Sequence, residues 1–390
     1  MSPLPGYEVN IVETAPTPSQ LGNIGTLFAS GKADTPGFGM VYSIDQFTSI
    51  FGDRQASAPY LWDGVQVYFR EGGYRAYISA VGVDYDPSDI ASAMDAFVPD
   101  YGPGTLCAFG ETDPAVHLAL ASQTAYSRIA LLDAPDDPDV QILTSAAKAV
   151  TDGSTLSGER FSAMFAPWDI VPGLIAGTTR TTPPSARVAG NLARNDALGW
   201  SPGDGAVAAL GIASYAQQLS QPAWSDGDRT TLNESGVNIS RMIFSTVRTY
   251  GWRSLADQIT DNDWSMFNAA RIIMAIKFDL SVMAENFVFS KLDSMAKVTA
   301  KFGGAISLVL LDYFNQGDLY GDTFDESCSV DTGPAVNTDQ SFSEGRLMAN
   351  VGVRTAGMAE RVIINIAKVP MTEAVAVVSG TNGGSNGSGS

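Results

Sequence analysis

The feature that most constrains this chain is a long apolar helix pattern in its second half. Residues 261–292 contain no proline, and apolar side chains recur at intervals of three and four: Trp264, Phe267, Ile273, Ile276, Leu280, Met283 and Phe287. Thr260 and Asp263 stand as a capping box at its start, although Asp replaces the usual Glu. The preceding residues 238–247 are rich in Ile, Met, Phe and Val, which is typical of a strand. Such a helix must be buried, so we expect it to pack into a core.

Strand and helix patterns alternate through the first half of the chain. Strands are predicted over residues 25–30, 39–43, 74–81, 104–110, 129–132 and 161–165. Helices are predicted over residues 44–51, 60–70, 88–97, 114–127, 140–151 and 184–193, and a further short helix over residues 207–219 follows them. Ser43 and Gly52 are placed to cap the first of these helices. This alternation favours a mostly parallel sheet and predicts an α/β fold.

The composition excludes several classes of function. The net charge of −19 argues against direct nucleic-acid binding, because phosphate affinity comes from clustered Lys and Arg. Cys107, Cys328 and His117 are too few for a zinc site or a disulfide framework. Gly31-Lys32 lacks the glycine and hydroxyl of a phosphate-binding loop. We therefore predict no catalytic residue, no cofactor site and no metal site.

One acidic run leaves two interpretations open. Asp133, Asp136, Asp137 and Asp139 follow a predicted strand, at the end of the sheet where ligands of α/β proteins often bind. They are either ligands of a cation or part of a solvated loop that caps the next helix. The second interpretation is favoured, since prolines punctuate the run.

Both ends of the chain have the pattern of an extended arm. At the N-terminus, Tyr7, Val9 and Ile11 alternate with polar residues before a Pro-rich spacer. At the C-terminus a strand is predicted over residues 362–368, followed by Pro370 and a second strand-like run that includes Thr372, Val375 and Val377. Each arm either folds back on its own chain or adds a strand to a neighbour. The last residues, GTNGGSNGSGS, are typical of a flexible tail.

Several short motifs occur along the chain in a fixed order. They are Phe69–Tyr77 (FREGGYRAY), residues 183–200 (PPSARVAGNLARNDALGW), Gly236-Val237-Asn238-Ile239, Gly251-Trp252-Arg253-Ser254-Leu255, Asn268-Ala269-Ala270-Arg271, residues 316–321 (QGDLYG) and residues 345–353 (GRLMANVGV). Together they resemble the contractile tail sheath family, which builds the outer cylinder of contractile phage tails, tailocins and related injection systems. The resemblance covers residues 6–368 and departs from the family pattern at Ser329, at Thr355-Ala356 and at Arg361.

The resemblance implies a multi-domain α/β sheath fold, with α+β character in its C-terminal domain. The expected parts are an N-terminal arm at residues 1–20, an α/β region at 21–200 that is one domain or two subdomains splitting near residue 84, a C-terminal domain at 201–368, and a C-terminal arm with the flexible tail at 369–390. It further implies that Arg194 and Asp196 form structural ion pairs, and that strands containing Val362, Ile364 and Ile366 receive the arms of neighbouring subunits.

The implied function is structural. Subunits of this family stack as hexameric rings into a helical cylinder around a tail tube, and contraction drives the tube through a target envelope. The implied partners are further copies of the chain, the tail tube protein, and baseplate and tail terminator proteins. The N-terminus lacks the features of a secretory signal, and the apolar runs are too short to span a bilayer, so we expect synthesis in the bacterial cytoplasm and a location in a virion tail or injection particle.

Two other classes of protein stay open at this stage. Another self-assembling shell protein would lack the ordered motifs. An α/β enzyme would need a cleft of convergent polar groups, for which the sequence offers scattered Asp residues and a single His.

Overall fold

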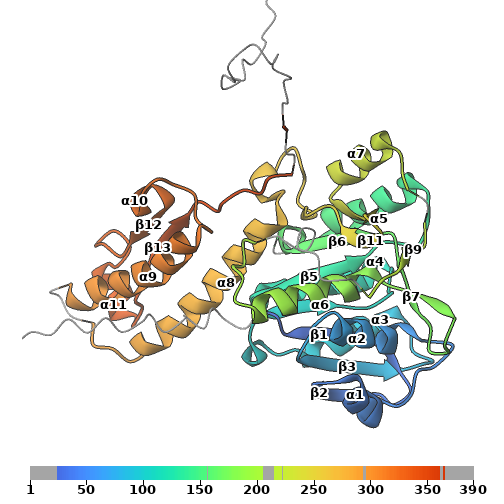
Figure 1. Ribbon diagram of the computed structural model, residues 1–390. Coiled ribbons are helices and arrows are strands. Elements are labelled where there is room, and N and C mark those ends of the chain that lie inside the picture. The colour runs from blue at the N-terminus through green and yellow to red at the C-terminus, as the bar shows by residue number, and fades with distance from the viewer. Residues whose placement is uncertain are drawn as a thin grey trace, which may run out of the picture. The chain divides into compact units, whose positions relative to one another are not determined.

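The computed structural model describes residues 24–155, 157–204, 215–221, 223–292, 296–360 and 363–364 (Figure 1). The chain divides into two compact units, residues 1–357 and 358–390. The helices and strands of the described residues all lie in the first unit. The predicted N-terminal arm and most of the predicted C-terminal arm lie outside the described residues.

A single eight-stranded sheet forms the centre of the first unit. Its order is β11-β10-β6-β5-β4-β1-β3-β2, and the six inner strands are parallel, whereas β11 and β2 are antiparallel at the two edges. The strands are β1 Leu27–Ala33, β2 Gly37–Val41, β3 Ala76–Gly82, β4 Gly104–Cys107, β5 Arg128–Asp133, β6 Ser162–Ala166, β10 Val237–Ile243 and β11 Thr246–Thr249. The predicted mostly parallel α/β sheet is therefore confirmed.

Two groups of helices cover the sheet. The bounds are α1 Ile44–Phe51, α2 Tyr60–Arg70, α3 Pro87–Ala93, α4 Pro114–Gln123, α5 Val140–Gly153, α6 Pro184–Ala197 and α7 Asp226–Glu234. Alternate residues of a strand point to opposite faces. On β5, Leu132 belongs to the apolar core formed with α3, α4 and α5, whereas its neighbour Asp133 contacts α6 on the other face. Helices α2 and α6 pack together on that second face.

The remaining elements form smaller structures in the same unit. Helices α8 Phe267–Ala284 and α9 Lys297–Gln316 pack against each other. Strands β12 Cys328–Asp331 and β13 Asn350–Val353 form a two-stranded antiparallel sheet. The short helix α10 Phe324–Ser327 precedes β12, and α11 Asp339–Ser343 lies between the two strands in the sequence. A three-stranded sheet contains β7 Asp169–Pro172, β8 Thr179–Thr182 and β9 Gln218–Leu219.

The structure corrects the predicted start of the long helix. Helix α8 begins at Phe267 after Met266, and residues 262–264 form a 3-10 turn. The predicted capping box does not form, because the backbone N–H of Thr260 donates to the side chain of Asp257 instead. The helix also ends earlier, at Ala284, where a further 3-10 turn follows.

Two other predicted elements are wrong in part. The predicted strand at residues 238–247 is a β-hairpin, because the chain reverses at Phe244 and Ser245 between β10 and β11. A helix was expected over residues 207–219, but residues 218–219 form strand β9, and residues 205–214 lie outside the described part. The sheet also extends across the expected domain boundary at residue 200, since β10 pairs with β6.

We predict that Gly190→Ala destabilises the protein. Gly190 lies where α6 meets α2, and a Cβ there would be 2.6 Å from Cβ of Glu71 and 2.7 Å from the carbonyl oxygen of Tyr68. Overpacking of this kind lowers the free energy of unfolding by about 1–3 kcal/mol. Urea denaturation measures the change.

Gly304→Ala in α9 is the matched control. A Cβ at Gly304 meets no atom within 4 Å. The better helix propensity of Ala then raises the free energy of unfolding by up to about 1 kcal/mol. Equal changes for the two variants would contradict the close packing of α6 on α2.

Candidate functional site

Helix α6 is unusual because it is polar and yet buried along nearly its whole length. From Pro184 to Ala193 each of its residues is buried, and so is Asn195. An unpaired charge in such a place would cost several kcal/mol, so its charged residues require partners. Those partners come from elements on several sides of the helix and form what we call the α6 charge network, comprising Arg187, Arg194 and Asp196 with the groups they contact.

Arg187 ties α6 to three strands. Its guanidinium donates to Asp169 of β7 at 2.7 Å, to the hydroxyl of Thr249 of β11 at 2.8 Å and to the hydroxyl of Ser240 of β10 at 2.6 Å. Burial raises the pKa of Asp169, and the adjacent guanidinium of Arg187 opposes that shift. The pair therefore fixes the edge hairpin of the sheet against the helix face.

Arg194 and Asp196 join α6 to two more helices. Arg194 donates to the carbonyl oxygen of Glu71 at 2.6 Å and lies 3.6 Å from its carboxylate. Asp196 accepts from Arg271 of α8 at 2.6 Å. Burial raises the pKa of both carboxyl groups, Glu71 and Asp196. The prediction that Arg194 and Asp196 form structural ion pairs is confirmed.

Asp133, at the end of β5, is fully buried on the same face. Its carboxylate accepts from the N–H of Ser185 at 2.9 Å, from the Ser185 hydroxyl at 2.7 Å and from the N–H of Gly110 at 3.0 Å. In the described part of the chain no Lys or Arg forms an ion pair with it. Burial outweighs the hydrogen bonds and raises the pKa of Asp133 to about 6.

The rest of the acidic run behaves as a capping loop. Asp139 accepts from the N–H of Gln141 and caps α5, while Asp137 accepts from the N–H of Asp139. Asp136 accepts from Ser220 and Gln221. The favoured interpretation as a solvated, helix-capping loop is therefore confirmed for Asp139 and wrong for Asp133, which is buried. Within the ranges that the structure describes, no three His, Cys, Asp or Glu side chains are grouped as metal ligands.

The histidine and the two cysteines are buried. Nε2 of His117 lies 3.0 Å from the carbonyl oxygen of Glu111, and burial lowers the pKa of His117 to about 4. Cys107 and Cys328 are free and buried, and burial raises the pKa of both thiols. This environment favours a neutral imidazole and protonated thiols, which suits packing and not acid–base or nucleophilic chemistry.

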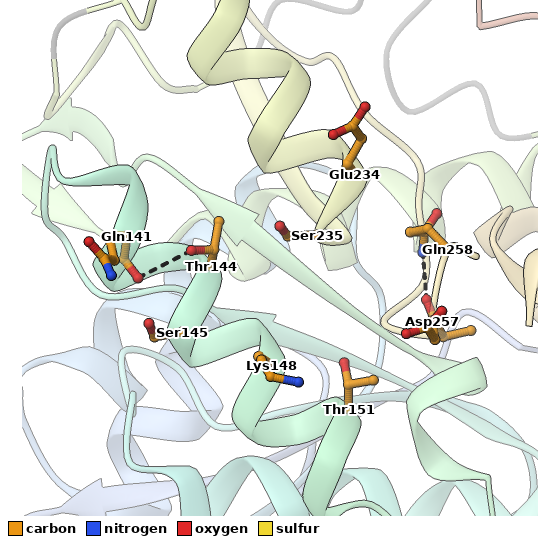
Figure 2. A pocket seen from close by; sticks show the side chains of 10 residues that line it. Gln141, Thr144, Ser145, Lys148, Thr151, Glu234, Ser235, Asp257 and Gln258 are labelled. Atoms are coloured by element: carbon orange, nitrogen blue, oxygen red, sulfur yellow. Dashed lines mark hydrogen bonds between the residues drawn. The ribbon is translucent and has the colours of Figure 1, made fainter. Parts of the chain in front are cut away.

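Surface pockets in the described part include one beside α5 and another beside α8. One, of about 270 Å³, lies between α5, the end of α7 and residues 256–258 (Figure 2). Its lining is polar, and Lys148 is paired with Asp152 at 2.9 Å. The other, of about 390 Å³, lies between α8 and the end of β13 and is lined by Asp263, Trp264, Ala269, Ile273, Val353, Arg354 and Thr355. Neither lining contains a His or Cys.

The predicted arm and receiving residues are largely outside the described part. Tyr7, Val9, Ile11, Val362, Ile366, Thr372, Val375 and Val377 all belong to residues without a description. Ile364 is described, is 76% exposed and belongs to no strand of the single chain. The assignment of these residues to intersubunit strands stays a prediction.

Two surface features were missed by the sequence reasoning. The β12–β13 sheet has only two strands, so each strand has one side without a partner among the described residues. Phe244 is 93% exposed at a positive φ in the β10–β11 turn. The sequence gives no signal for this turn. It contains no Gly or Asn, and its Phe lies within a run of Ile, Met and Val. Among the described helices, none has the length and apolar character needed to cross a bilayer.

Comparison with known proteins supplies the fold assignment. No protein-family model matches the chain, and no curated protein matches it by sequence. A chain of the anti-feeding prophage baseplate is similar over 95% of this chain and 100% of that one, with a TM-score of 0.70 and 21% identity. A chain of the PVC sheath complex, an extracellular contractile injection system in its contracted state, is similar over 96% and 99% respectively, with a TM-score of 0.68 and 18% identity.

A more distant crystal structure agrees with these two. The sheath tail protein of Desulfitobacterium hafniense is similar over 84% of this chain and 93% of that one, with a TM-score of 0.54 and 9% identity. The chain therefore has the fold of the contractile sheath proteins, as its motifs indicated, and the structures it resembles are assembly subunits.

We predict that Arg187→Met strongly destabilises the protein. The variant leaves the carboxylate of Asp169 buried without its charged partner, which costs about 3–5 kcal/mol in the free energy of unfolding. Lys148→Met, which removes an ion pair with exposed side chains, serves as the control and should cost less than about 1 kcal/mol. Chemical denaturation of both variants tests this, and similar small losses would show that the α6 charge network is dispensable.

A pH dependence follows from Asp133. An aspartate in an unfolded chain titrates near pH 3.9, and this one near 6 when folded, so the folded state binds the proton more tightly. The protonated carboxyl then contributes at most about 3 kcal/mol of stability below pH 4, which is lost as the pH rises through 6.

Asp133→Asn should remove this component. Between pH 4 and pH 7, the unfolding free energy of the wild type is expected to fall relative to that of the variant, by up to about 3 kcal/mol. Urea denaturation at a series of pH values measures the difference, with the exposed Asp152→Asn as the control for loss of one charge. Parallel curves for wild type and Asp133→Asn would refute the assignment.

Proposed function

We propose that this protein is the structural subunit of a contractile sheath, which assembles as stacked rings around a tail tube. The observation that carries the proposal is the fold likeness, which extends over nearly the whole of this chain and of the sheath and baseplate chains compared with it. The ordered motifs from Phe69 to Val353 support it independently, because they come from the sequence alone.

The proposed partners follow from the same likeness. The similar chains come from a helical sheath, a sheath complex and a baseplate. We propose that this chain binds further copies of itself in hexameric rings, a tail tube protein, and baseplate and terminator proteins at the two ends. Its location would then be a virion tail or an injection particle, after synthesis in the bacterial cytoplasm.

The internal construction of the first unit suits a subunit that moves without unfolding. The α6 charge network joins α2, α8 and strands of two sheets, and any relative shift of these elements would separate buried charges. Contraction of a cylinder would therefore change contacts between subunits and leave this packing intact. The driving energy would be a difference in intersubunit packing, with no nucleotide required.

The two-stranded β12–β13 sheet is suited to receive arms. A two-stranded sheet is marginal by itself and gains stability from added strands. An arm that pairs with an outer side of β12 or β13 would form ~4–6 backbone hydrogen bonds at about 1 kcal/mol net each. The predicted arm strands at residues 7–11 and 372–379 are candidates for these additions, and the strand predicted at residues 362–368 is a candidate for a further receiving strand. Neighbours would then stay connected while their bodies rotate.

The first test is negative-stain electron microscopy of the purified protein at high concentration, alone and with its tube protein. Striated hollow cylinders with six-fold end views are expected. Monodisperse particles under both conditions would contradict the proposal.

Deletion of residues 1–20 tests the arms. We expect a folded monomer with the circular dichroism spectrum and melting temperature of the full chain but without cylinders, because the added strand is lost. Deletion of residues 380–390, which are rich in Gly and Ser, is the matched control and should leave cylinders intact. Normal cylinders from the chain lacking residues 1–20 would refute the role of the N-terminal arm.

A further inference from the structure

The β10–β11 hairpin ends in a turn whose residues are poorly suited to it. Ile243 pairs with Thr246, which leaves Phe244 and Ser245 as a two-residue turn with φ values of 48° and 63°. Two positive φ values are the mark of a type I′ turn, for which Asn-Gly is strongly preferred. A bulky residue in this region is a genuine outlier, and here its ring is 93% exposed. The chain thus carries strain and an exposed aromatic ring at one point.

The same hairpin also concentrates positive charge. Arg241 and Arg248 stand directly opposite each other in the ladder, an arrangement of like charges that is destabilising. Neither forms an ion pair with a residue of the described part. The guanidinium of Arg241 lies 4.8 Å from the ring centre of Tyr250, and Nε of Arg248 is buried without a hydrogen-bond partner. In a chain of net charge −19, this paired cationic site is complementary to the chain's own surface.

The pocket between α8 and the end of β13 has the opposite character. Trp264, Ala269, Ile273 and Val353 give it an apolar lining, and Asp263 adds a carboxylate that no described residue pairs as a salt bridge. Its one basic residue, Arg354, lies over the ring of Tyr320, with its guanidinium 5.4 Å from the ring centre. The pocket, of about 390 Å³, therefore offers an apolar wall, with the carboxylate of Asp263 and the guanidinium of Arg354 also in its lining.

We propose that the β10–β11 hairpin of one copy of this chain inserts into the α8–β13 pocket of a second copy. The ring of Phe244 would cover the apolar lining, and Arg241 and Arg248 would face the carboxylate of Asp263. The occupant is a second copy because the cationic hairpin complements the strongly acidic chain itself. The inference rests on the proposed sheath function, in which each copy is surrounded by others. Since the two surfaces differ, the contact is heterologous and repeats from copy to copy, as rings and helical cylinders require.

Disulfide crosslinking tests the contact directly. The double variant Ser245→Cys/Thr355→Cys keeps the ring of Phe244 and places one cysteine at the tip and one in the pocket, and the native Cys107 and Cys328 are buried. After oxidation of assembled cylinders, we expect a ladder of covalent dimers and longer chains on a non-reducing gel. Each single variant should give no ladder. Cylinders of the double variant that yield no ladder would overturn the inference.

A second test separates assembly from stability. Replacing the turn by Asn-Gly, as Phe244→Asn/Ser245→Gly, relieves the strain and should raise the melting temperature of the monomer by about 1–2 °C. It should also abolish cylinders, because the ring is lost. A merely structural hairpin tip would leave assembly unchanged, and that result would overturn the proposal.

Phe289→Asn is the matched control. Phe289 is also fully exposed at positive φ, 64°, but is not part of the hairpin. Cylinders should persist in this variant, and equal loss in both would show that the hairpin is not specific. Failure of the wild-type chain to form cylinders with its tube protein would instead refute the sheath function, and this inference with it.

Discussion

The interaction on which the rest of the structure depends is the burial of charge along α6. Arg187, Arg194 and Asp196 lie in the interior, and each has its partner on a different element. Compared with apolar packing, such pairs add little net stability, but any arrangement that separates them leaves a charge unpaired at a cost of several kcal/mol. Helix α6 thus selects one relative placement of α2, α8, β7 and the β10–β11 hairpin, and the orientation of every outer surface follows from that placement.

A rigid interior has a direct bearing on how an assembly of such subunits works. The charge network resists internal rearrangement, although Nε of Arg194, Nε of Arg271 and Oδ2 of Asp196 are buried without a hydrogen-bond partner among the described residues. At the surface, Phe244 is 93% exposed, and β12 and β13 each have one side without a strand partner in the described part. In the proposed sheath, the energy for a change of shape would then be stored in contacts between subunits, and its release would leave the fold intact.

Helices and strands that have a local sequence signal were predicted from the sequence. The helix from Ile44 to Phe51 was predicted with its bounds, since Ser43 accepts the capping hydrogen bond and Gly52 ends the helix at positive φ. The start of α8 was misplaced because a 3-10 turn carries the same apolar spacing as the helix. The hairpin was missed because Phe244 and Ser245 are not the residues that a two-residue turn with positive φ prefers. The partners of Arg187, distant in sequence, could not be found from pattern at all. The arms were predicted on residues outside the described part, so they stay a prediction.

The late position of β10 in the sequence shapes how the protein is made. Strand β6 pairs with β5 on one side and with β10 on the other, and β10 is separated from β6 by the whole segment that contains β7, β8, α6 and α7. While the nascent chain ends before Val237, the edge of β6 lacks its partner, and Arg187 lacks the hydroxyls of Ser240 and Thr249. The sheet can close only after the hairpin has left the ribosome. Between the synthesis of β6 and that of β10, translation therefore leaves an open edge that is prone to aggregation.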